Sequence, residues 1–161
     1  MSDAVKSIEQ EAHHCLAEKK YEEAADLFCN AAKAYQKVNN HEAAALCFAS
    51  SAGCWAEKCG EQPYYNAAND YERAAKEAVQ AKDYLYASLL YKHSAICHEK
   101  DQDYRGFSDC FYESKEYYRK HLSLRVFNSK KIFHVKKSIP KDSLKDRVDQ
   151  FRMLLIESFL S

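Results

Sequence analysis

The segment Tyr21–Ala32 reads YEEAADLFCNAA, and the same order of residue types occurs four more times further along the chain. An aromatic residue or His comes first, a small residue three positions later, Phe or Tyr four positions after that, and Ala or Ser three positions further on. Steps of three and four residues place all four side chains on one face of an α-helix. The later copies are His41–Ala52, Tyr64–Ala75, Tyr84–Ala95 and Tyr104–Lys115, with Phe107 at the first small position of the last copy.

The copies begin 20, 23, 20 and 20 residues apart, which leaves room for one helix and one short turn each. A small residue lets a neighbouring helix approach to about 8–9 Å, and an aromatic residue fills the space beside it. The small positions hold Ala24, Ala31, Ala44, Ala67, Ala74 and Ala87, and the large positions hold Phe28, Phe48, Tyr71, Tyr91 and Phe111. The pattern predicts an all-α fold, a right-handed α-solenoid of antiparallel helix hairpins.

Turn residues divide the predicted helices. Gly60 suits the end of one helix and Pro63 the first turn of the next, which accounts for the single longer step. Asn39 and Asn40 predict a turn with a capping side chain, and Asp83 and Asp103 each precede a repeat's Tyr, where a carboxylate can accept the unpaired amides. With a first helix over about 3–19, six helices are expected by residue 123.

The chain has 161 residues, of which 47% are hydrophobic, and this suits one domain with a tail. Only three Gly and two Pro occur, which disfavours a β-rich fold. We expect a helical repeat domain over 1–123, a basic connector over 124–141 and a C-terminal amphipathic helix over 142–161. These elements make about seven helices in total.

Charge is balanced overall but divided along the chain. The formal net charge is zero, with −7 over residues 1–118 and +7 over 119–161. No apolar run reaches the roughly 18 residues of a membrane span, and the first residues are too polar for a secretory signal. Seven cysteines without a CxxC pair indicate free thiols in the core. A cytoplasmic location is expected.

The repeated segments resemble the tetratricopeptide family of helical repeats over about residues 3–118. Ile8 stands at the large opening position, followed by residues at the family's small and aromatic positions: Ala12, Tyr21, Ala24, Phe28 and Ala31. The even helix spacing is most similar to the soluble NSF attachment protein (SNAP) branch. The resemblance implies a scaffold for protein–protein interaction, with vesicle trafficking or assembly of a larger complex as its setting.

The sequence carries none of the common catalytic motifs and no complete metal-binding motif. Neither a P-loop nor GxSxG, GxGxxG or HExxH occurs. His13-His14-Cys15 and His93-x3-Cys97-His98 could ligate a metal, since His93 and Cys97 share a helix face, but neither motif offers a third and fourth ligand at zinc-finger spacing. We therefore expect no enzyme activity, no cofactor and no metal.

The basic segment 119–137 contains seven Lys or Arg residues and no acid. It is either a solvated connector or a surface that attracts an acidic partner. Binding to acidic lipid or nucleic acid is the alternative, although the acidic repeats disfavour nucleic acid. The candidate contact residues of this segment are Arg119, Lys120, Arg125, Lys130, Lys131, Lys136 and Lys137.

The last predicted helix has a broad apolar stripe that includes Leu155, Phe159 and Leu160. It can close the end of the array, insert in a groove of a partner, or pair with its copy in a homodimer. Together these features predict a non-catalytic adaptor for a protein partner with an acidic or helical surface, with peripheral membrane contact as a further option.

Overall fold

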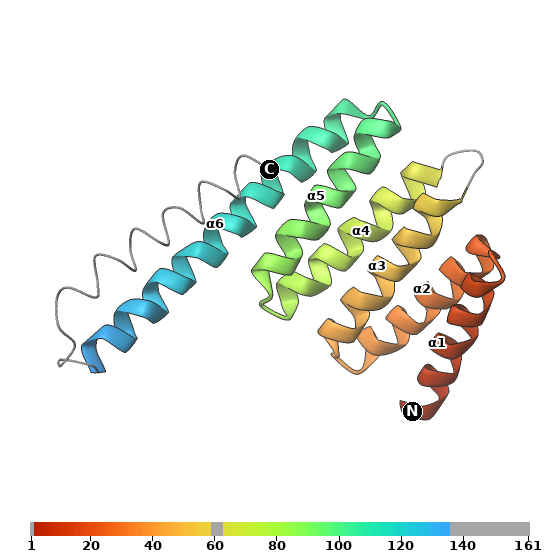
Figure 1. Cartoon of the computed structure of the whole chain (residues 1–161), viewed down its shortest axis with the longest axis horizontal. Coiled ribbons are helices and arrows are strands. Elements are labelled where there is room, and N and C mark those ends of the chain that lie inside the picture. The colour runs from red at the N-terminus through yellow and green to blue at the C-terminus, as the bar shows by residue number, and fades with distance from the viewer. Residues whose placement is uncertain (1, 59–62, 136–161) are drawn as a thin grey trace. The chain divides into compact units, whose positions relative to one another are not determined.

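A computed structural model describes the backbone of residues 2–58 and 63–135 and the side chains of residues 4–58 and 63–126. Within these ranges the chain is helical apart from short turns and contains no strand. The helices are α1 (Ser2–Ala17), α2 (Tyr21–Lys37), α3 (His41–Glu57), α4 (Pro63–Gln80), α5 (Tyr84–Lys100) and α6 (Tyr104–Val135) (Figure 1). The all-α fold class expected from the repeats is thus confirmed.

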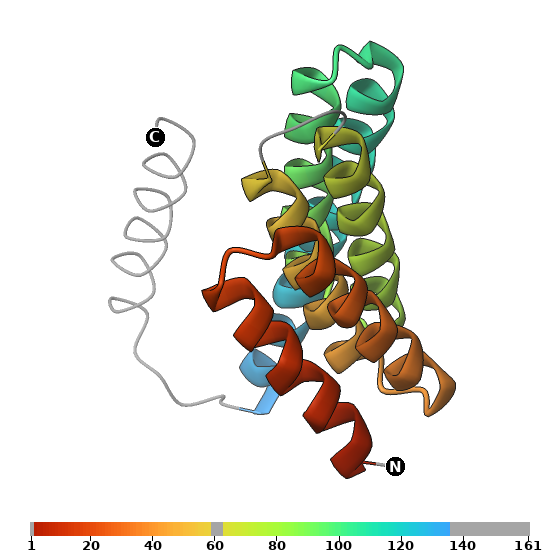
Figure 2. The same cartoon turned by 90° about the vertical axis from the view of Figure 1, so that its right-hand side faces the viewer.

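The chain divides into two compact units, Met1–Ser123 and Leu124–Ser161. In the first unit each helix packs against the next in the chain, and α1 and α2 lie side by side in both views (Figure 2). Helix α6 ends at Val135, so residues 124–135 of the expected connector are helical. The remaining connector and the predicted helix over 142–161 lie outside the described residues.

Side-chain caps begin three of the helices. Asn40 accepts a hydrogen bond from the backbone N–H of Ala43 at 3.2 Å, and Asp83 accepts one from Tyr86 at 3.0 Å. Asp103 accepts one from Gly106 at 3.0 Å. These bonds satisfy amides that the first helical turn leaves unpaired, as the sequence predicted.

Four turns share one backbone feature. The residue two positions before the helix start has a positive φ in each: Lys19 at 61°, Asn39 at 56°, Lys82 at 62° and Gln102 at 61°. This left-handed conformation ends the preceding helix and turns the chain back on it. None of the four is glycine, so each turn carries some backbone strain.

The predicted small positions form the centre of the helix contacts. All six of the predicted alanines are completely buried. Phe28, Phe48 and Tyr91 are buried beside them, and Tyr71 is half-buried. Backbones therefore approach closely at the alanines while the rings fill the adjoining space, which confirms the predicted alternation of small and large residues.

Phe111 does not follow this pattern, because it is 41% exposed. Helix α6 instead turns Cys110 and Ser114 towards the core, and Phe107 and Tyr117 pack partly against it. No helix of the described part follows α6, so the face that carries Phe111 has no neighbour there to cover it. The expectation of a buried ring at this position is wrong.

None of the helices in the described part is both long and apolar enough to cross a membrane.

Candidate functional site

The basic residues predicted as contacts divide between described and undescribed parts of the chain. Arg119 forms an ion pair with Glu116 one turn before it on α6, and Arg125 is exposed on the same helix. Lys130 and Lys131 belong to α6. The other candidates lie outside the described residues: Lys136, Lys137, Leu155, Phe159 and Leu160.

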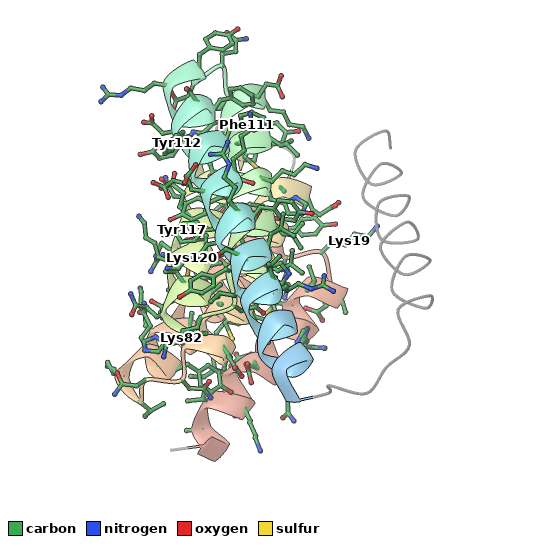
Figure 3. All side chains as sticks on the ribbon, turned by 90° about the vertical axis from the view of Figure 1, so that its left-hand side faces the viewer. Lys19, Lys82, Phe111, Tyr112, Tyr117 and Lys120 are labelled. Atoms are coloured by element: carbon green, nitrogen blue, oxygen red, sulfur yellow. The ribbon has the colours of Figure 1, made fainter. Side chains whose placement is uncertain are left out.

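Lys120 belongs to a stack of tyrosines at the α5–α6 contact. The ring of Tyr117 lies parallel to Tyr84, with centroids 6.2 Å apart, and to Tyr91, with centroids 5.6 Å apart. The ammonium of Lys120 lies 4.2 Å from the centre of the Tyr84 ring. Figure 3 labels Tyr117 and Lys120 close together along α6. The positive charge of Lys120 is therefore engaged within the chain by a cation–π contact.

A groove of about 220 Å³ lies where α3, the end of α4 and the start of α5 meet. Two of its lining residues, Glu42 and Asp83, carry carboxylates. The other lining residues are Ala45, Leu46, Ala78, Ala81 and Tyr86. Leu46 stands in the groove and is 59% exposed. The groove thus offers apolar surface with negative charge at its edge.

Helix α5 carries further exposed apolar side chains. Leu89 is one turn after Tyr86 and is 47% exposed, and Leu85 and Ile96 are each 38% exposed. Steps of four and seven residues place these three side chains on one face of the helix. We call Leu46, Leu85, Leu89 and Ile96 the apolar row.

A second cavity, of about 320 Å³, lies between α4 and α6 with α5 behind it. Its charged lining residues are three acids, Glu72, Asp109 and Glu113, and one lysine, Lys76. The rest of the lining consists of Tyr91, His98, Gly106, Cys110 and Tyr117. This cavity holds the most polar buried cluster of the first unit.

His98 is the centre of that cluster. Its Nε2 lies 3.1 Å from Oε1 of Glu72, and its Nδ1 lies 3.0 Å from Oδ2 of Asp103. The second distance suits an ion pair, but Nδ1 makes no hydrogen bond because the ring is not aligned with that oxygen. The thiol of Cys110 is 3.6 Å from the same Glu72 oxygen. Hydrogen bonding to the Gly106 amide lowers the pKa of Asp103, and His98 adds to this effect.

The contact between the Cys110 thiol and the Glu72 carboxylate has counterparts elsewhere in the array. Cys47 donates a hydrogen bond to Glu9 at 3.1 Å between α3 and α1. Cys29 donates one to Asp70 at 3.4 Å between α2 and α4, where Ser51 also donates to Asp70 at 2.6 Å. Helices two apart in the chain are therefore joined by a thiol–carboxylate contact over the helix between them.

The described thiols do not have the character of nucleophiles. Six are free: Cys15, Cys29, Cys47, Cys54, Cys97 and Cys110. Burial raises the pKa of Cys54 and of Cys110 to about 11, and it raises the pKa of Cys47 further, with the Glu9 carboxylate adding to the effect. Cys47, Cys54 and Cys110 are therefore protonated near neutral pH, and Cys47 and Cys110 donate hydrogen bonds to carboxylates.

Three residues of the two short His and Cys motifs, namely His13, His93 and Cys97, pack against rings or buried alanines. His13 packs edge-on against Phe28, and His93 stacks on Tyr71. Cys97 packs with the buried alanines of α4. The only described group of three possible ligands at metal-binding distance is Glu72, His98 and Cys110. The sequence motif that ends at His98 pointed to one member of this group, but not to Glu72 or Cys110, because the three residues lie on three different helices.

No family model matches the sequence, and no curated protein matches it either.

Proposed function

We propose that this chain is a non-catalytic adaptor that binds a partner protein on the exposed face of its helical array. The apolar row carries this proposal. Four large apolar side chains on α3 and α5 contact water, and covering them releases about 25 cal/mol for each Å² of apolar surface. Large apolar side chains that are exposed together on one helix face, as Leu85, Leu89 and Ile96 are, are typical of protein interaction sites.

The chemistry of the row defines the partner. The groove beside Leu46 has an apolar lining, with the carboxylates of Glu42 and Asp83 at its edge. A helix or extended segment with bulky apolar side chains fits this lining, and a basic residue next to them pairs with the carboxylates. We therefore expect a partner segment that is apolar on one side and carries Lys or Arg beside that side.

The finer architecture belongs to the same proposal. We infer a right-handed α-solenoid of antiparallel helix hairpins, similar to tetratricopeptide and SNAP-like arrays. Vesicle trafficking or assembly of a larger complex is the setting that this likeness suggests. Support for it comes from the repeat pattern and from the packing of consecutive helices, which are features of fold.

The alternative is binding of acidic lipid or nucleic acid through the basic segment 119–137. Described cations of this segment have partners within the chain, since Arg119 pairs with Glu116 and Lys120 lies over Tyr84. These contacts leave less free positive charge than the sequence alone implies. The apolar row is therefore the better-supported contact surface.

Replacing Leu89 by Glu tests the proposal. The full-length wild type, Leu89→Glu and the control Tyr65→Glu are each used as bait, and recovered proteins are quantified by mass spectrometry. Tyr65 is a matched control because its exposure of 49% is close to the 47% of Leu89 and it lies on α4, outside the row.

The partner should bind the wild type and Tyr65→Glu equally. We expect its affinity for Leu89→Glu to fall by about 30-fold or more, the loss typical of a central interface residue. The measurement is repeated with the purified partner. Equal recovery by all three baits rejects the apolar row. Recovery that depends instead on residues after Ser123, and weakens steeply with salt, supports the alternative.

A further inference from the structure

Three side chains able to bind a metal meet at the junction of α4, α5 and α6. The carboxylate of Glu72, the imidazole of His98 and the thiol of Cys110 each offer an atom, and these atoms all lie within 4.8 Å of one another. His98 and Cys110 are buried, with exposures of 5% and 4%. Nitrogen, sulfur and oxygen ligands of this kind suit Zn²⁺.

The spacing of the three atoms is close to that of a zinc site. Ligand atoms about 2.0–2.3 Å from Zn²⁺ in a tetrahedron lie about 3.3–3.7 Å from one another. Nε2 of His98 is 3.1 Å from Oε1 of Glu72, and Sγ of Cys110 is 3.6 Å from the same oxygen. The third separation, between the His98 nitrogen and Sγ of Cys110, is within 4.8 Å, and side-chain rotations would bring all three atoms to one ion.

A carboxylate lies beside the second nitrogen of the His98 ring. Nδ1 is 3.0 Å from Oδ2 of Asp103 but makes no hydrogen bond to it. A zinc-binding histidine donates this N–H to a carboxylate, so the proposed site needs a small turn of the ring that aligns the two groups. Gly106 lies against the ring, because an added Cβ there would be 2.5 Å from Nδ1. A close approach of α6 thus depends on that glycine.

One coordination position is open. The cavity of about 320 Å³ reaches Glu72, His98 and Cys110, so water can complete a tetrahedron. Lys76 is the nearby cation, 3.8 Å from Oε2 of Glu72, which is the oxygen that faces away from His98. The Lys76 side chain is 65% exposed and can move aside.

An equivalent junction of the same array provides a comparison. Glu9 accepts hydrogen bonds from Cys47 at 3.1 Å and from Tyr35 at 3.1 Å. Glu9, Tyr35 and Cys47 belong to three consecutive helices, as Glu72, His98 and Cys110 do. Tyr35 and His98 have the same offset from the start of the repeat copy on their helix, and so do Cys47 and Cys110. Tyr35 thus stands where His98 stands, and a neutral tyrosine is a far poorer zinc ligand than an imidazole.

We propose that Glu72, His98 and Cys110 bind one Zn²⁺ ion, with a water molecule from the cavity as fourth ligand. Cys110 binds as the thiolate, and its proton passes to solvent. The ion joins α4, α5 and α6 and stabilises the end of the repeat domain. This site is separate from the apolar row, so either can fail without the other.

Metal titration of the full chain, purified metal-free, tests the site. We expect one Zn²⁺ per chain by elemental analysis and a rise in melting temperature. Co²⁺ serves as the spectroscopic probe, because a thiolate ligand gives it a charge-transfer band in the near ultraviolet. Cys110→Ser should remove this band and raise the Zn²⁺ dissociation constant by more than about 100-fold. This is more than the loss expected from mutating a residue that only hydrogen-bonds to a metal ligand.

Cys47→Ser is the matched control, since it removes a buried thiol beside a carboxylate but leaves His98 in place. It should keep the band and the affinity. Glu72→Gln tests the half-buried ligand if Cys110→Ser does not fold, as judged by circular dichroism, and should also weaken binding. The proposal is wrong if saturating Co²⁺ gives no band, if the band persists in Cys110→Ser, or if Cys47→Ser abolishes it. The cluster is then an ion-paired contact of His98.

Discussion

At the scale of single residues, the two helical glycines of the described chain have opposite surroundings. Gly106 lies in the first turn of α6, and a Cβ there would meet Nδ1 of His98 and Oδ2 of Asp103, each at 2.5 Å. Gly53 lies in α3 and has no atom within 4 Å of such a Cβ. The first glycine allows a close approach, whereas the second leaves open space.

Replacing each glycine by alanine should therefore change stability in opposite directions. Gly106→Ala forces the buried His98 ring to move, and we expect the free energy of unfolding to fall by about 1–3 kcal/mol. Gly53→Ala removes backbone freedom from the unfolded chain without a clash, and should raise that energy by about 0.5–1 kcal/mol. Urea unfolding measures both. A neutral or stabilising Gly106→Ala would contradict the packing described.

At the scale of the helix and its turns, one connection is used repeatedly. Asn40, Asp83 and Asp103 cap the helix that follows each turn. The residue two positions before the helix start has a left-handed backbone, and lysine holds this position in two turns. Asn tolerates the left-handed region better than Lys, because its side chain can hydrogen-bond locally.

Lys82→Asn should stabilise the protein for this reason. With φ at 62°, relief of strain is expected to raise the free energy of unfolding by about 0.5–1 kcal/mol. Lys92→Asn in the exposed part of α5 is the control, and lower helix propensity should make it destabilising by about 0.5 kcal/mol. Thermal or urea unfolding compares the two. A destabilised Lys82→Asn would show that this lysine makes a contact worth more than the strain.

At the scale of the whole molecule, stability should fall at alkaline pH. Burial raises the pKa of Cys47, Cys54, Tyr71 and Tyr86 in the folded state. The unfolded chain loses these protons first, so their contribution is fully present below about pH 9 and decreases as pH rises above it. The stabilising contribution of Cys54 decreases between pH 9.0, the ordinary pKa of its thiol, and about pH 11, its pKa in the folded state.

Urea unfolding at several pH values between 8 and 11 measures this loss. The control is Cys54→Ala, which lowers stability at pH 8 through the missing side chain. It should show a shallower further decrease above pH 9, because one proton fewer is released on unfolding. Equal slopes for the wild type and the variant would rule out a contribution from this thiol.

Local pattern was sufficient for much of this protein. Steps of three and four residues identified the buried alanines, and Asp83 and Asp103 were identified as caps because each precedes the Tyr of a repeat. Both features depend on neighbours within one helix or turn. The burial of Phe111 was predicted wrongly, because burial depends on whether another helix covers that face. Sequence spacing does not supply that neighbour.

The sequence by itself determined that the chain forms successive helices that pack through alternating small and aromatic residues. Only the tertiary structure decided that Glu72, His98 and Cys110 meet, and that Leu46 and Tyr86 line one groove. The physical reason is that helix formation follows from contacts a few residues apart. These sites instead form between helices two apart in the chain, whose approach is set by packing through the helix between them.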